Sequence, residues 1–204
     1  MNIRHLITVV ILLLAISCSK SPIELYDLAE QELKQDNSNL AINNLKLLIS
    51  KHPNDSLASK AQYKLASVYL NWEDEISLGL EALKNTVSNY PKTIHANQAQ
   101  KEIERFPQFL LDKGESLRKQ KKLKESVDHL MYLTNYYSNS EIAPKGQYML
   151  GDVYMNDFRD FATAIQEYRK VIENYNGSIQ EPHALFMIGY IYANVINDTK
   201  SAKI

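Results

Sequence analysis

The residue types that carry out catalysis or bind metal ions are scattered along this chain. The histidines at positions 52, 95, 129 and 183 show no metal-ligand spacing, and there is no HExxH motif. The six glycines form neither a phosphate loop nor a dinucleotide fingerprint, and no serine lies in a GxSxG elbow. We therefore expect no enzyme activity, no cofactor and no metal.

The single cysteine, Cys18, is the one side chain whose position in the sequence suggests a chemical modification. It follows an apolar run of 11 residues, Leu6–Ile16, which is interrupted only by Thr8 and preceded by Arg4. That length suits the core of a signal peptide and falls short of the roughly 20 residues of a spanning helix. The residues LAISC at 14–18 resemble the bacterial lipobox, with alanine where leucine is usual. An ordinary secretory signal with an unrelated cysteine is the alternative.

The lipobox resemblance divides the N-terminal region at Cys18. It implies a signal peptide at residues 1–17, lipidation of Cys18, and a short tether at residues 18–21. One acyl chain gives only marginal membrane binding, whereas two or more give stable anchoring. By the habit of such lipoproteins, Ser19 after the cysteine indicates the periplasmic face of the bacterial outer membrane.

The composition is that of an ordinary folded protein. The 204 residues carry a net charge of −1, with 45% apolar and 23% charged residues. A near-neutral charge argues against a nucleic-acid partner, and the apolar content is too high for a disordered chain. Six glycines and six prolines are few turn-forming residues for a fold of many strands, so helices are expected.

Most of the chain after the tether repeats. Segments 41–71, 126–156 and 164–194 align without a gap, at offsets of 85 and 38 residues, and segment 79–103 aligns with the first at 38. Tyrosines recur at shared repeat positions: Tyr69, Tyr154 and Tyr192; Tyr90, Tyr137 and Tyr175; Tyr63 and Tyr148, with Phe186. Another position holds only small residues (Ala66, Gly151, Gly189), which predicts a close crossing of helices.

Each repeat contains two helical patterns. Apolar residues at three- and four-residue spacing predict helices over 57–71 and 76–89, and Pro53 and Pro91 follow the second helix of a repeat. The stretch from residue 93 to 121 is too long for one such helix, and Pro107 predicts a break between helices over 93–105 and 107–121. Such amphipathic pairs gain a common core only by stacking on their neighbours.

Leu150-Gly151-x-x-Tyr154, followed by Ala164-x-x-x-Tyr168, resembles the tetratricopeptide repeat pattern. The period is 38 residues in place of 34, with one residue added in the turn within the repeat and three after the proline position. The resemblance implies an all-α, tetratricopeptide-type helical solenoid of antiparallel helix pairs over residues 22–204. It would hold four to five repeats, the last truncated, which suggests a fragment of a longer protein.

The resemblance also implies a partner-binding groove on one face of each first helix. The candidate residues, spaced to share a face, are Lys60, Tyr63, Ser67, Asn71, Lys145, Tyr148, Asp152, Asn156, His183, Phe186, Tyr190 and Asn194. The alternative is a solvated face whose asparagines cap helix ends. A basic cluster, Arg118, Lys119, Lys121, Lys122 and Lys124, is either a solvated turn or a contact for anionic lipid or an acidic partner.

With a lipobox upstream, the long-period repeats are similar to the lipoproteins of the β-barrel assembly machinery (BamD-like) and to the periplasmic coordinator of the Tol-Pal system. The expected function is a lipid-anchored scaffold that binds envelope proteins or extended peptides, in outer-membrane protein assembly. A Tol-Pal or cell-division coordinator is a second possibility. Two alternatives belong to other functional classes. One is the docking arm of an envelope enzyme whose catalytic domain lies beyond residue 204, and the other is a binder of peptidoglycan or a small ligand.

Overall fold

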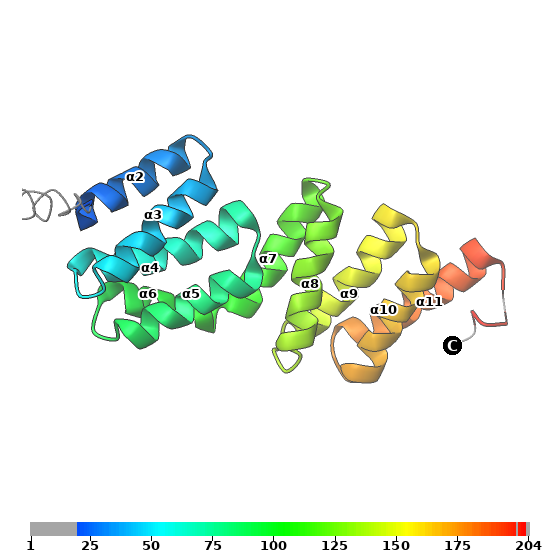
Figure 1. Ribbon diagram of the computed structural model, residues 1–204. Coiled ribbons are helices and arrows are strands. Elements are labelled where there is room, and N and C mark those ends of the chain that lie inside the picture. The colour runs from blue at the N-terminus through cyan, green and yellow to red at the C-terminus, as the bar shows by residue number, and fades with distance from the viewer. Residues whose placement is uncertain (1–19, 199, 203–204) are drawn as a thin grey trace, which may run out of the picture. The chain divides into compact units, whose positions relative to one another are not determined.

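Every regular element in the described part of the chain, residues 20–198 and 200–202, is a helix in the computed structural model (Figure 1). The predicted signal peptide and Cys18 lie outside these residues. The chain divides into two compact units, Met1–Ile103 (unit 1) and Glu104–Ile204 (unit 2). The predicted all-α class of tetratricopeptide-type helix pairs is confirmed.

Unit 1 is built from α2 (Pro22–Lys34), α3 (Ser38–Lys51), α4 (Ser56–Val68), α5 (Ile76–Asn89) and α6 (Ile94–Glu104). Local chemistry sets where these helices start. Ser21 and Glu24 form a reciprocal capping box on α2, and Asp55 caps α4 by accepting a hydrogen bond from the Leu57 amide at 2.8 Å. Both α3 and α5 end two residues before a proline, as predicted.

Unit 2 is built from α7 (Phe106–Lys119), α8 (Leu123–Tyr136), α9 (Ala143–Val153), α10 (Phe161–Asn174) and α11 (Gln180–Ile191). The predicted break before Pro107 is confirmed, because Arg105 leaves helical geometry between α6 and α7. Pro107 then occupies the first turn of α7, where a missing amide hydrogen costs nothing.

Each unit has two layers of helices. The first helices of the repeats lie in one layer, α2, α4 and α6 in unit 1 and α7, α9 and α11 in unit 2, and the second helices, α3, α5, α8 and α10, form the other. Consecutive helices from α2 to α5 and from α7 to α11 pack against each other in antiparallel pairs (Figure 1). The core between the layers is apolar; in unit 2 it includes Tyr168, Val171, Ile188 and Ile191, all almost fully buried.

Three first helices end in the same unusual way. A five-residue π-helical turn follows α4, α9 and α11 and begins at the shared tyrosine position: Tyr69–Glu73, Tyr154–Phe158 and Tyr192–Ile196. The next residue in each case, Asp74, Arg159 or Asn197, is left-handed at a φ of 57–58°. A π turn winds one additional residue into a helix end. The residue that the sequence predicts as added within the repeat is therefore absorbed here.

The small-residue position is the predicted crossing point. A Cβ placed on Gly151 would lie 2.4 Å from Cε1 of Tyr168, a ring that has no exposed surface. The equivalent residue in unit 1, Ala66, is completely buried. The absence of a side chain at Gly151 thus lets α9 approach the large ring on α10.

Candidate functional site

The predicted first-helix face of unit 1 is joined to neighbouring first helices. The ammonium group of Lys60 lies 4.3 Å from the ring centroid of Tyr26 on α2, and the Tyr63 hydroxyl donates a hydrogen bond to Glu102 on α6. Burial, followed by the Glu102 carboxylate, raises the pKa of Tyr63 to about 12. The Tyr63 ring also lies 6.1 Å from that of His95 on α6. This face is therefore a continuous row of aromatic and polar groups.

The same face recurs in unit 2. Tyr148, at the repeat position of Tyr63, lies 6.3 Å from His183 on the next first helix, α11. Further along α11, Phe186 is 69% exposed and Tyr190 is 44% exposed, with their ring centroids 6.4 Å apart. The structure thus brings Tyr148, His183, Phe186 and Tyr190 onto adjacent first helices as a partly exposed aromatic surface.

Asp152 takes a different place from the one that its repeat position suggested. Its carboxylate accepts a hydrogen bond from the Tyr168 hydroxyl at 2.6 Å, and its main-chain oxygen accepts one from Arg118 at 3.2 Å. Burial raises the pKa of Asp152, against the opposing effects of the Tyr168 bond and the Arg118 charge. Burial and the bond to Asp152 likewise raise the pKa of Tyr168. Asp152 therefore ties α9 to α10, and its place in a partner groove stays a prediction.

At two of the three repeats, the asparagine of the predicted face bonds to the end of its own helix, as the capping alternative describes. The side-chain amides of Asn71 and Asn194 donate hydrogen bonds to main-chain oxygens four residues earlier, at 3.0 and 3.1 Å. Each still has an amide oxygen to accept a bond, and both side chains are exposed. Ser67, Lys145 and Asn156 lie at the predicted face, and that face as a partner groove stays a prediction.

Three of the five residues in the basic cluster are paired within the chain. Asp157, in the π turn after α9, forms ion pairs with Arg118 at 2.6 Å and Lys121 at 3.1 Å, and Lys119 pairs with Glu115 at 2.8 Å. Burial of Asp157 opposes its ionisation, but the bonds from Arg118 and Lys121 outweigh it and hold its pKa below the usual value. Sequence reasoning did not find this network, because its partners are 36 to 39 residues apart.

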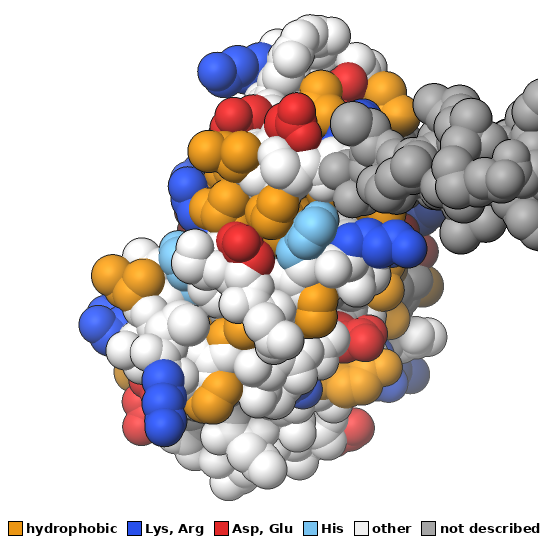
Figure 2. Space-filling view, turned by 60° about the vertical axis from the view of Figure 1, so that its left-hand side comes forward, with side chains coloured by type: hydrophobic (Ala, Val, Ile, Leu, Met, Phe, Trp, Pro, Cys, Tyr) orange, Lys and Arg blue, Asp and Glu red, His pale blue; other side chains and the backbone are white. Residues whose placement is uncertain are grey.

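The remaining two lysines, Lys122 and Lys124, are exposed. On the face drawn in Figure 2, basic and acidic side chains are interspersed with apolar and neutral ones. The basic cluster as a contact for lipid or an acidic partner stays a prediction that rests on two side chains.

A metal-binding cluster and a membrane-spanning helix are both absent from the described residues. Within residues 20–198 and 200–202, no group of three or more histidine, cysteine or acidic side chains is placed to hold a metal ion. No helix in this part of the chain has the length and apolarity needed to cross a membrane. Among the histidines, His52 lies 3.3 Å from the main-chain oxygen of Lys20, and His95 lies 3.1 Å from the Ser59 hydroxyl.

Among solved structures, the chain is similar to MamA, at 18% identity over 86% of this chain and 88% of that one, with a TM-score of 0.39. A MamA fragment from Desulfovibrio magneticus RS-1 is similar at 16% identity over 91% of both chains, with a TM-score of 0.35. The kinesin light chain repeats of Podosopora anserina are similar at 12% identity over 90% of this chain and 92% of that one, with a TM-score of 0.40. No curated protein matches the chain.

A family model does match, and it does so once in each unit. The model described as tetratricopeptide repeat matches residues 60–93 and 146–178, which are α4 with α5 and α9 with α10. These are the helix pairs that carry the π turn and the shared tyrosines. These two segments therefore match the tetratricopeptide repeat, a scaffold whose usual role is protein–protein interaction.

Proposed function

We propose that this chain is a lipid-anchored scaffold of the bacterial cell envelope that holds partner proteins or extended peptides on the first-helix face. Its proposed place is the periplasmic side of the outer membrane, in the assembly of outer-membrane proteins. The proposal unites the tetratricopeptide repeats with the lipobox at residues 14–18.

One observation supports the binding face above the others. In both units the aromatic ring at the same repeat position, Tyr63 or Tyr148, lies beside a histidine of the next first helix. The row continues on α11 with Phe186 and Tyr190, which keep large exposed surfaces. Aromatic side chains contribute much contact area at a small cost in side-chain entropy, which is why they dominate protein interfaces.

Site-specific photo-crosslinking tests the face directly. A benzoylphenylalanine at position 186 should give discrete adducts with envelope proteins. Tyr136 on α8 provides a matched control, because it is an aromatic of the second-helix layer with similar exposure, 71% against 69% for Phe186. The same adducts from both positions, or none from position 186, would contradict the proposed face.

The identity of the adducts also tests the biological role. Partners among β-barrel assembly proteins support the assembly role. Partners of the Tol-Pal system would replace it with the coordinator role while leaving the first-helix face intact.

The membrane anchor has its own test. Each buried CH₂ of an acyl chain contributes about 0.8 kcal/mol to membrane binding, and two or more chains make anchoring stable. The substitution Cys18→Ala should therefore move the protein from the membrane pellet to the soluble fraction. Immunoblotting of the two fractions measures its distribution. A variant that stays in the pellet would refute lipid anchoring through Cys18, whatever the crosslinking shows.

A further inference from the structure

A groove lies in unit 2 on the opposite side of α9 from the first-helix face. Its volume is about 480 Å³, and α9 contributes its floor through Gln147 and Leu150. The walls come from the second helices α8 and α10 and the turns after them: Met131, Thr134, Asn135, Ser138, Asn139, Glu167, Lys170, Asn174 and Tyr175. Leu150 and Tyr148, the aromatic residue of the first-helix face on α9, are separated by about 200° of rotation around the helix. The groove is therefore a surface distinct from the one proposed above.

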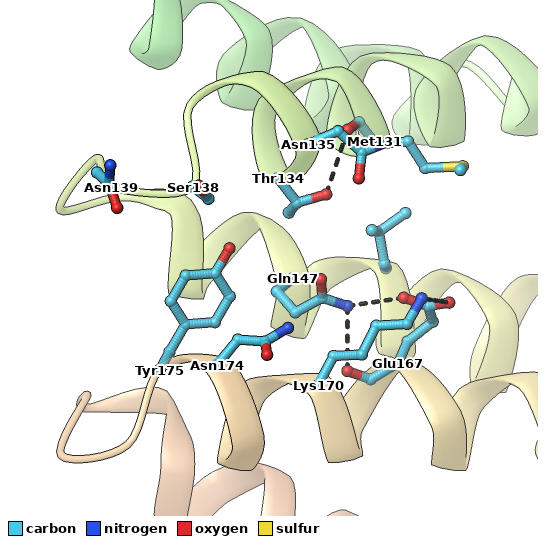
Figure 3. Close-up of a pocket in the computed structure, with 11 residues that line it drawn as sticks. Met131, Thr134, Asn135, Ser138, Asn139, Gln147, Glu167, Lys170, Asn174 and Tyr175 are labelled. Carbon is cyan, nitrogen blue, oxygen red and sulfur yellow. Dashed lines mark hydrogen bonds and ion pairs between the residues drawn. The ribbon is translucent and has the colours of Figure 1, made fainter.

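The charged groups of this groove are already matched to each other (Figure 3). Lys170 pairs with Glu167 at 2.8 Å, and the Gln147 amide nitrogen donates to the Glu167 carboxylate at 2.7 Å and to its main-chain oxygen at 3.1 Å. Gln147 is only 4% exposed, so these bonds fix its orientation. Its amide oxygen is turned away from Glu167, toward Thr134 (Figure 3). The floor of the groove thus presents a fixed acceptor, and the site carries no net charge.

The rim of the groove is rich in amides. Asn135, Asn139 and Asn174 are exposed, and each offers two donor hydrogens and an acceptor oxygen in one plane. A peptide main chain presents the complementary donor and acceptor. Within this lining set Tyr175 is the one aromatic residue, whereas a site for sugars would offer aromatic faces on which the rings stack.

Unit 1 has a groove at the same place in its repeat, with a volume of about 280 Å³. Seven lining positions correspond at the offset of 85 residues, and the floor is again a glutamine and a leucine, Gln62 and Leu65. The walls differ in chemistry. Lys46 replaces Met131 and lies 5.6 Å from the ring centroid of Tyr69, and Ile49 replaces Thr134. The repeat therefore generates the groove, and the residues of unit 2 make it wider and richer in amides.

We propose that the groove between α8, α9 and α10 binds an extended, uncharged polypeptide segment through its main chain. The asparagine amides would bond to main-chain groups of the ligand, and the Gln147 oxygen would accept from a ligand N–H. A charged side chain entering the groove would gain no partner, because Glu167 and Lys170 neutralise each other. The site is independent of the first-helix face.

The test uses the full chain and a phage library of random peptides that contain only uncharged residues. Selected peptides are synthesised with blocked ends, and their Kd is measured by fluorescence anisotropy. The chain offers two matched pairs of variants at equivalent repeat positions, both members of each pair being exposed asparagines: Asn174→Trp with Asn89→Trp, and Asn139→Trp with Asn54→Trp. Thermal melting checks that all four remain folded.

We expect Asn174→Trp and Asn139→Trp to weaken binding at least about tenfold, because the indole fills the groove of unit 2. The Asn89→Trp and Asn54→Trp variants should bind as the unaltered chain does. Failure to select any peptide would overturn the proposal, and so would selected peptides that bind all four variants equally. It would also be overturned if a trimer of N-acetylglucosamine bound in place of peptides and lost its binding in the Asn174→Trp variant.

Discussion

Gly151 and Tyr168 show how single residues set the distance between helices in this protein. The ring of Tyr168 occupies the space that a side chain on Gly151 would need, and its hydroxyl reaches Asp152. Unit 1 solves the same crossing with Ala66 and Leu83, both without exposed surface. The two pairs are alternative ways to fill one volume, since packed cores tolerate little change in it.

Gly151→Ala should therefore lower the free energy of unfolding by about 1–3 kcal/mol, the usual cost of overpacking a core. The double variant Gly151→Ala/Tyr168→Leu, which recreates the pair of unit 1, should recover part of the loss. Recovery is incomplete because Tyr168→Leu also removes the bond to Asp152. Urea unfolding measures both. If Gly151→Ala alone were as stable as the unaltered chain, the Tyr168 ring would have to move aside without cost.

Repeat positions predicted some of the packing at these residues, and other contacts appear only in the structure. The small-residue position and the shared tyrosines follow from side-chain size, which the sequence displays. Asp152 was assigned to the partner face because it shares a helical position with Ser67 and Tyr190. Its partner Tyr168 replaces the leucine of unit 1, and only the geometry of α9 and α10 shows that the two side chains meet.

At the scale of elements, the π turn after α9 is held by an ion-pair network. Asp157 in the turn is 8% exposed at its side chain and bonds to Arg118 at the end of α7 and to Lys121 just beyond it. Removing the partner of a buried charge strongly destabilises the folded state, because the remaining charge is left uncompensated. The network thus links the end of one first helix to the turn of the next.

Arg118→Ala should lower the free energy of unfolding at neutral pH by about 1.5–3 kcal/mol, the value of a hydrogen bond to a charged group. Lys119→Ala serves as the control, because Lys119 and Glu115 form an exposed pair worth at most about 1 kcal/mol. Equal losses from the two substitutions would show that Asp157 needs only Lys121.

The same network predicts a dependence on pH. The pKa of Asp157 is lower in the folded chain than in the unfolded one. Its contribution is therefore complete above the unfolded pKa, roughly 4, and is lost as the pH falls through the lower folded pKa. Between pH 5 and pH 2, Arg118→Ala should lose less stability than the unaltered chain, as measured by urea unfolding at a series of pH values. If the two proteins lost the same amount of stability over this pH range, Asp157 would be excluded as the source of the pH dependence.

Element boundaries were the most predictable level of the structure. The helix predicted over 76–89 forms over those residues, and the break at Pro107 separates α6 from α7. The helix predicted over 57–71 ends in the π turn from Tyr69, because periodicity reports a helical face and not the number of residues in the last turn. The groove of unit 2 escaped sequence reasoning, since it depends on the separation of three helices.

At the scale of the whole molecule, the chain is two units of stacked pairs. In repeat proteins each helix pair draws its stability from its immediate neighbours, so damage in one place spreads little. Gly151→Ala should speed amide hydrogen exchange in α9 and α10 while the amides of α4 and α5 keep their protection. Mass spectrometry of peptic fragments measures both regions in one sample. Equal acceleration in both units would show that the chain unfolds as a single cooperative body.

The three π turns have a consequence for engineering. Their closing residues, Asp74, Arg159 and Asn197, share nearly the same backbone angles, with φ of 57–58° and ψ of 28–30°. Each π turn thus ends with the same backbone geometry. They are natural junctions for grafting, at which a module from one copy could be spliced onto another without a designed linker.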